Sequence, residues 1–291
     1  MAGFAQWLAA QRIRRVIFIA GFFPLPFLGV LSAATVVMAA YLQGPRAALI
    51  DCALALLLVA GLASVSGSDP ALLALSAVAT WLVWIGLGSL AGRSRSLVLA
   101  VQFAVLLGVL AMVGFLIVND DPTAFWVEVL EKVYADLERQ GFTVQADIGE
   151  QARLMTGVVF AAVLGGLLVP LLLGIAWGCR VEKRDFGLQL RTLSLGYVLG
   201  GIAALVGVAA LLGVQTYGML LVLGAAFALQ GLAVLVWWAH RLGWPRLWWL
   251  GLVALGLLPT ALVLQLTLLS AVGFVDNWYG LRRGSVPPAP R

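Results

Sequence analysis

Charged side chains are scarce in this sequence. Its 291 residues include 18 Lys and Arg and 13 Asp and Glu, 11% in all, whereas 63% are apolar. Soluble domains carry about 25% charged residues, so the composition excludes an ordinary soluble globular protein. Long uncharged runs recur, each sufficient to cross a hydrocarbon core of about 30 Å with about 20 helical residues. Because these runs lack the alternation of a membrane β-barrel, they predict an all-α, polytopic membrane bundle.

Catalytic and metal-ligating side chains are equally few. The chain has one histidine, His240, and two cysteines, Cys52 and Cys179, without metal-site spacing. It contains no HExxH, no GxSxG, no P-loop and no GxGxxG after a strand. Only His240 is available as a positioned base, so we expect no enzyme activity, no catalytic residue, no metal and no cofactor. The basic residues behind the net charge of +5 lie at the ends of the apolar segments. Signals for membrane orientation and contacts with anionic lipid headgroups account for them there, so we expect no nucleic-acid partner.

About eight apolar segments follow one another in a predicted single transmembrane domain, residues 1–285, with a disordered tail at 286–291. They are Val16 to Leu42, Ala47 to Ser64, Ala71 to Leu90, Leu97 to Val118, Leu154 to Gly178, Leu193 to Val214, Gly218 to Ala239 and Leu247 to Val275. The first and last would each form a helix of about 40 Å, longer than the core. Both contain proline, which interrupts a helix. We expect the first to be a hairpin, whereas for the last a hairpin and one kinked span remain open.

The basic residues gather on one side of the predicted membrane. Alternate connections hold nine of them: Arg46, Arg93, Arg95, Arg180, Lys183, Arg184, Arg191, Arg241 and Arg246. The opposite side holds three, in residues 119–153, among eight of the thirteen acidic residues. Since cytoplasmic loops carry the excess of Lys and Arg, we expect a multi-pass protein of a bacterial inner membrane, with residues 119–153 in the periplasm.

The acidic interval contains signals for an external helix. Asp121 before Pro122 suits a helix start, and Gly141 suits a helix end. Apolar residues recur at helical spacing, and the pairs Glu128–Lys132 and Lys132–Asp136 are four apart. The sequence therefore predicts an amphipathic helix over about 122–140, its apolar face on the bundle or in the interface plane. An irregular or short helical piece would follow up to Arg153. The apolar positions are Trp126, Val129, Leu130, Val133 and Leu137.

Few polar side chains lie deep in the apolar runs, and these are the candidate ligand-binding residues. Asp51 is a functional candidate by its charge, although pairing with Arg46, or snorkelling, explains it equally. The amide of Gln230, beside Gly231, requires a partner, either on another helix or on a ligand. Gln102 is a further deep amide, as is Gln265. Small residues four apart, at Gly174 and Gly178 and at Gly196 and Gly200, are expected to mark helix contacts.

Three motifs of the C-terminal third, over about residues 180–285, stand out: RVEKRDFGLQLRTLSLG, FALQGLAVLVWWAHRLGWPRLWWL and GFVDNWYGLRR. In these motifs the chain resembles the YybS-like family of predicted bacterial membrane proteins. The resemblance implies no catalytic residue, and it implies an architecture distantly like the vitamin-binding subunits of energy-coupling-factor transporters. Two functions remain. One is an interaction or scaffold component with membrane-protein partners on the Gly-rich helices or the helix at 122–140. The other is a transporter-type subunit that binds a small molecule near Gln230 and Gly231.

Overall fold

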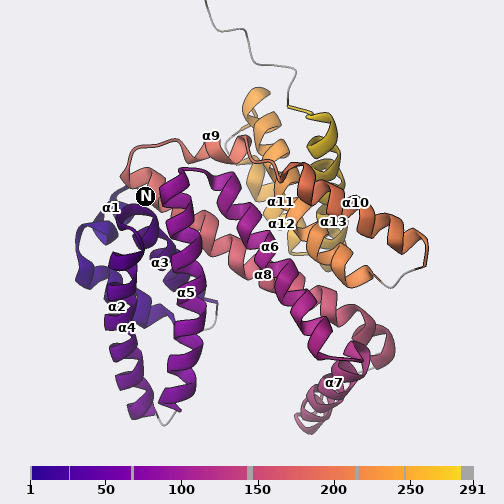
Figure 1. Ribbon diagram of the computed structural model, residues 1–291, viewed down its shortest axis with the longest axis horizontal. Helices are drawn as coiled ribbons and strands as arrows, with labels where there is room; N and C mark the ends of the chain where they lie inside the picture. The colour runs from indigo at the N-terminus through magenta and orange to yellow at the C-terminus, as the bar shows by residue number, and fades with distance from the viewer. Residues whose placement is uncertain are drawn as a thin grey trace, which may run out of the picture. The chain divides into compact units, whose positions relative to one another are not determined.

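The computed structural model describes residues 2–25, 27–66, 69–142, 147–213, 216–245 and 247–282, and within them every regular element is a helix (Figure 1). This confirms the all-α prediction. Six of these helices are long and apolar enough to cross a membrane. The bounds are α1 Ala2–Ala10, α2 Arg12–Phe22, α3 Gly29–Gln43, α4 Pro45–Ser66, α5 Pro70–Ser94, α6 Leu97–Val118, α7 Pro122–Arg139, α8 Ile148–Val181, α9 Phe186–Arg191, α10 Gly196–Leu211, α11 Tyr217–Arg241, α12 Trp248–Gly256 and α13 Pro259–Tyr279. The expected tail at 286–291 lies outside the described residues.

The chain divides into two compact units. The first comprises Met1–Ala104 and Gly165–Leu193, and the second comprises Val105–Leu164 and Ser194–Arg291. The long helices α6 and α8 therefore contribute one part to each unit. In the first unit α2, α3, α4 and α5 pack on one another, and in the second α13 packs on α10, α11 and α12.

The first apolar run is a helical hairpin, as its prolines predict. Its arm α2 has 11 residues, about 16 Å of helix, which is too short to cross the bilayer core. The hydroxyl of Ser32 on α3 donates to the carbonyl oxygen of Ile19 on α2 at 2.8 Å. At the open end, Arg15 Nη2 donates to Gln43 Oε1 at 3.1 Å. The start of α2 thus lies beside the end of α3, and the chain returns to the side from which it came.

The last apolar run is also broken into two helices. The 9-residue α12 packs on α13, and Pro259 begins α13, where its missing N–H is tolerated. At the other end of α13, Asn277 Nδ2 donates to the carbonyl oxygen of Gly196 at 3.0 Å. Gly196 begins α10 just after the connection that holds Arg180 to Arg191, and α12 begins just after the connection that starts at Arg241. The start of α12 and the end of α13 therefore both adjoin basic connections. This arrangement corresponds to the hairpin alternative.

Glycines hold the helices close. A Cβ at Gly174 would lie 2.5 Å from the carbonyl oxygen of Ala34, and one at Gly178 would overlap the ring of Tyr41. These two residues therefore seat α8 against α3, as their spacing predicts. In the second unit, a Cβ at Gly231 would overlap the carbonyl of Leu269 on α13.

The amphipathic helix α7 forms largely as predicted. Asp121 Oδ1 accepts from the Ala124 N–H at 3.0 Å, and Lys132 pairs with Glu128 at 2.6 Å. Part of the apolar face packs on the bundle: Leu130 is buried and Trp126 Nε1 donates to Thr156 Oγ1 of α8 at 2.8 Å, whereas Val133 is 46% exposed. Gly141, at φ +89°, follows the end of the helix.

Two details of the acidic interval differ from the prediction. Asp136 pairs with Arg139, three residues on, rather than with Lys132, which Glu128 already holds. Residues 148–153 are not a separate piece but the first turns of α8. The reason is local: Asp147 Oδ1 accepts from the Glu150 N–H at 3.2 Å and so starts α8 early. Residues 143–146 lie outside the described residues.

Candidate functional site

Gln230 is the centre of a buried polar cluster in the second unit. Its side chain is fully buried on α11. Its Oε1 accepts from the Leu195 N–H at 2.9 Å, and its Nε2 donates to Asp276 Oδ2 at 2.8 Å. Since Leu195 directly precedes α10 and Asp276 is on α13, this one amide joins three helices. The expectation of an interhelical partner for Gln230 is confirmed, whereas a ligand role stays a prediction.

Asp276 and its neighbour complete the cluster. Asp276 is 3% exposed and is neutralised by Arg282, whose Nη2 lies 2.5 Å from Oδ2 and whose Nε lies 3.2 Å from Oδ1. Gly280, at φ +60°, ends α13 and turns the chain so that Arg282 reaches back. Asn277 Oδ1 is buried and has no hydrogen-bond partner within the described chain. The cluster fixes α10, α11 and α13 with its charges balanced.

Gly231 has a packing role. The close approach of Leu269 leaves no room for even a methyl group on the α13 side. Any ligand at this position would have to displace the backbone of α13. Gly231 therefore brings α11 and α13 together and does not border an open site on that side.

Asp51 lies in the first unit, and its predicted partner is wrong. The carboxylate is fully buried and pairs with Arg15 Nε at 2.7 Å and with Arg12 Nε at 3.0 Å, not with Arg46. Five residues along a helix rotate a side chain by about 140°, so Arg46 points away from Asp51. The hairpin supplies the partners instead, because α2 packs on α4.

The four candidate residues do not form one site within either unit. Asp51 and the half-buried Gln102 of α6 belong to the first unit. Gln230 and Gly231 belong to the second, beside Asp276 and Asn277. The sequence reading missed Asp276 and Asn277 because it ended the last apolar run at Val275. The signal in the sequence was the pair Asp276–Asn277 with Arg282 six residues after the aspartate. At that spacing the turn at the end of a helix lets the arginine reach back to the carboxylate.

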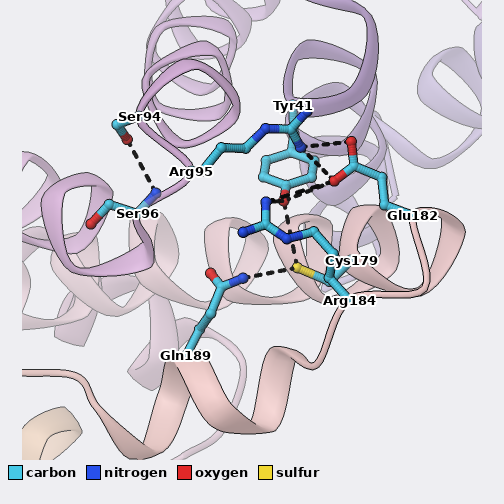
Figure 2. A network of polar contacts seen from close by, with 8 residues as sticks. All are labelled: Tyr41, Ser94, Arg95, Ser96, Cys179, Glu182, Arg184 and Gln189. Carbon is cyan, nitrogen blue, oxygen red and sulfur yellow. Dashed lines mark hydrogen bonds and ion pairs between the residues drawn. The ribbon is translucent and has the colours of Figure 1, made fainter.

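A second polar network closes the basic end of the first unit (Figure 2). Arg95 Nη1 donates to Glu182 Oε1 at 2.6 Å, and this hydrogen bond is the main cause that raises the pKa of Arg95 above its ordinary value. The hydroxyl of Tyr41 donates to Glu182 Oε2 at 3.3 Å and accepts from Arg184 Nη1 at 3.3 Å. Cys179 Sγ lies 3.6 Å from the same hydroxyl. The network therefore ties the ends of α3, α5 and α8 and keeps Cys179 buried among hydrogen-bonding groups.

Two apolar cavities lie in the second unit, and both open to the surroundings, because Leu211, 88% exposed, lines the larger and Leu257, 78% exposed, lines the smaller. The larger, about 1050 Å³, is walled by α8, α10, α11 and α13, and its few hydroxyls include Thr267, which donates to its own helix at Val263. The smaller, about 690 Å³, lies between α11, α12 and α13 and is lined by Trp248, Trp249 and Gln265 among apolar residues. Gln230 and Gly231 line neither of them. The space for a ligand thus adjoins the polar cluster without containing it.

Comparisons with protein families, with curated proteins and with solved structures give no match to this chain.

Proposed function

We propose that this chain is a membrane protein whose second unit binds an apolar or amphipathic small molecule, the transporter-type alternative. The observation that carries the proposal is the cavity of about 1050 Å³. Ligand pockets typically enclose about 300–1000 Å³ and are lined mostly by apolar and aromatic side chains.

The walls of the cavity define the kind of molecule that fits it. No charged residue is among the described residues that line it, so a buried ionic group would be left without a partner. Three of its walls belong to the helices that are long and apolar enough to cross a membrane, α8, α11 and α13. A hydrocarbon-rich molecule therefore reaches the cavity from the bilayer more readily than from water.

The polar cluster supports this role by holding the cavity open in one shape. Phe227 and Phe274 line the cavity, and each lies three residues, about one turn, before a cluster residue: Gln230 and Asn277. The hydrogen bonds of Gln230 fix the spacing of α10, α11 and α13 at that level. Gln230 thus acts on a ligand through the helices that it joins.

The cellular setting belongs to the same proposal. We place the chain in a bacterial inner membrane with its basic connections in the cytoplasm, on the strength of the Lys and Arg distribution. Membership of the YybS-like family is proposed from the motifs of residues 180–285. The terminal hairpins support this threading, because they bring Arg15 to the end of α3, Arg12 to Asp51 near the start of α4, and Arg282 to Asp276 beside the start of α10.

A matched pair of glycine substitutions tests the binding proposal. Gly207 and Gly201 are both on α10, and a Cβ at either would meet nothing within 4 Å, but only Gly207 lines the cavity. Gly207→Phe should weaken binding of a long-chain hydrocarbon probe at least tenfold, because the ring occupies the cavity. Gly201→Phe should leave binding unchanged. Equal binding by both variants and the parent chain would refute the proposal.

The interaction or scaffold role is a second candidate, carried by α7. Its exposed apolar residues, Phe125 at 40% and Val133 at 46%, stand among charged side chains on a helix anchored to α8. Affinity capture in mild detergent, with and without residues 123–140, tests this role. A partner that is captured only with the helix present would support it, and identical captured sets would exclude α7 as a docking helix.

A further inference from the structure

The smaller cavity holds a polar atom that lacks a partner. Gln265 lies on α13 and lines this cavity of about 690 Å³. Its Oε1 is buried and accepts no hydrogen bond from the described residues. An amide oxygen offers two lone pairs, and a buried acceptor left unpaired is costly. A ligand with a hydrogen-bond donor would remove that cost.

The surroundings of Gln265 show where the oxygen points. A Cβ built on Gly256 of α12 would lie 3.8 Å from Oε1, so the oxygen faces the one residue of that wall without a side chain. Trp248 and Trp249, at the start of α12, line the same cavity. Tryptophan favours the level of the lipid headgroups, which places the Trp248 end of the cavity near the membrane surface. Gly256 ends the same helix, about 12 Å farther along, so Gln265 lies at the deeper end of the cavity.

The two cavities share part of their lining. Ala225 of α11 and Leu266 of α13 line both of them. No Lys, Arg, Asp or Glu is among the described residues that line either cavity. An ionised carboxylate or phosphate has only acceptors, so it cannot donate a hydrogen bond to Gln265 Oε1. The described lining also offers no cation that would balance its charge. The lining therefore selects against anionic headgroups and for a neutral donor.

We propose that Gln265 recognises the headgroup of the bound molecule, a neutral lipid-like alcohol or amide. The O–H or N–H of the ligand donates to Gln265 Oε1 in the smaller cavity, and its hydrocarbon chain extends past Leu266 into the larger one. This inference rests on the proposed function and adds the ligand class and the residue that reads it.

Two probes of equal chain length test the inference: hexadecanol, which has a donor, and hexadecyl methyl ether, which has none. Binding to the purified full-length protein in detergent is measured by native mass spectrometry. The parent chain should prefer the alcohol by about tenfold, the equivalent of one hydrogen bond. Gln265→Leu should bind both probes equally, since its side chain has no acceptor. Leu266→Trp, at the shared wall, should weaken both.

The outcomes separate the two proposals. A parent chain that binds both probes equally, or a Gln265→Leu variant that keeps the preference, overturns the role of Gln265. The cavity proposal still stands in that case if Gly207→Phe weakens both probes. Failure of the parent chain to bind either probe overturns both. The thermal unfolding of each variant is recorded beside the binding, so that a misfolded variant is not counted as a loss of recognition.

Discussion

Replacing Gln230 with leucine should destabilise the second unit. The substitution removes two buried hydrogen bonds, to Leu195 and to Asp276, and leaves Asp276 with Arg282 as its remaining partner. Single interhelical hydrogen bonds in membranes contribute about 0.6–1.7 kcal/mol, so the loss should be about 1–3 kcal/mol. Leucine has nearly the volume of glutamine, so the effect reports the hydrogen bonds rather than an empty space.

Gln265→Leu is the matched control. The substitution is the same, on a neighbouring helix of the same unit, but the buried oxygen that it removes has no hydrogen-bond partner in the described chain. Replacing an unpaired acceptor by an apolar group is neutral or stabilising. Unfolding in mixed micelles of sodium dodecyl sulfate and dodecyl maltoside, followed by tryptophan fluorescence, should therefore show a loss only for Gln230→Leu. Coincident unfolding curves for the two variants would mean that the Gln230 hydrogen bonds do not hold the helices together.

Three further predictions concern the rest of the chain. Arg15→Leu should cost up to about 3–5 kcal/mol, because it removes the buried partner of Asp51 and leaves only the half-exposed Arg12 of this pair of cations. The double variant with Asp51→Leu should recover most of the loss in the same unfolding assay. A cysteine in place of Arg184 should react with an impermeant maleimide only in broken cells. A cysteine in place of Gln145, which lies outside the described residues, should react in intact cells. The reverse pattern would mean that the threading is inverted. Deletion of Thr123–Gln140 with a short linker should leave membrane insertion intact in a fractionation assay, and loss of insertion would make the helix part of the structural core.

Local signals in the sequence predicted the helices well. The run from Leu97 to Val118 coincides with α6, and Asp121 before Pro122 marks the start of α7. These boundaries depend on residues within one turn of the helix end, so a single sequence contains the information. The early start of α8 followed the same rule through Asp147, which the apolar pattern alone overlooked.

Partners distant in the chain were beyond such reasoning. Asp51 meets Arg15, 36 residues earlier, because a hairpin folds back, and the sequence offered Arg46 as a nearer cation. The Asp276 cluster was missed because helix α13 continues one turn past its apolar run, to Tyr279. The cavities arise where helices separated in sequence fail to fill the space between them. No spacing of residues along the chain encodes that gap.

Gly231 and Gly273 join α11 and α13 by backbone alone. A Cβ at either position would overlap main-chain atoms of the other helix, so no side chain can be accommodated there without moving a whole helix. Residues around the crossing, such as Leu266 and Gln265, meet cavity space and are not restricted in this way. Over many generations of substitution, the crossing should stay fixed while the cavity lining varies. The ligand preference of such a protein is therefore free to change without a change in its framework.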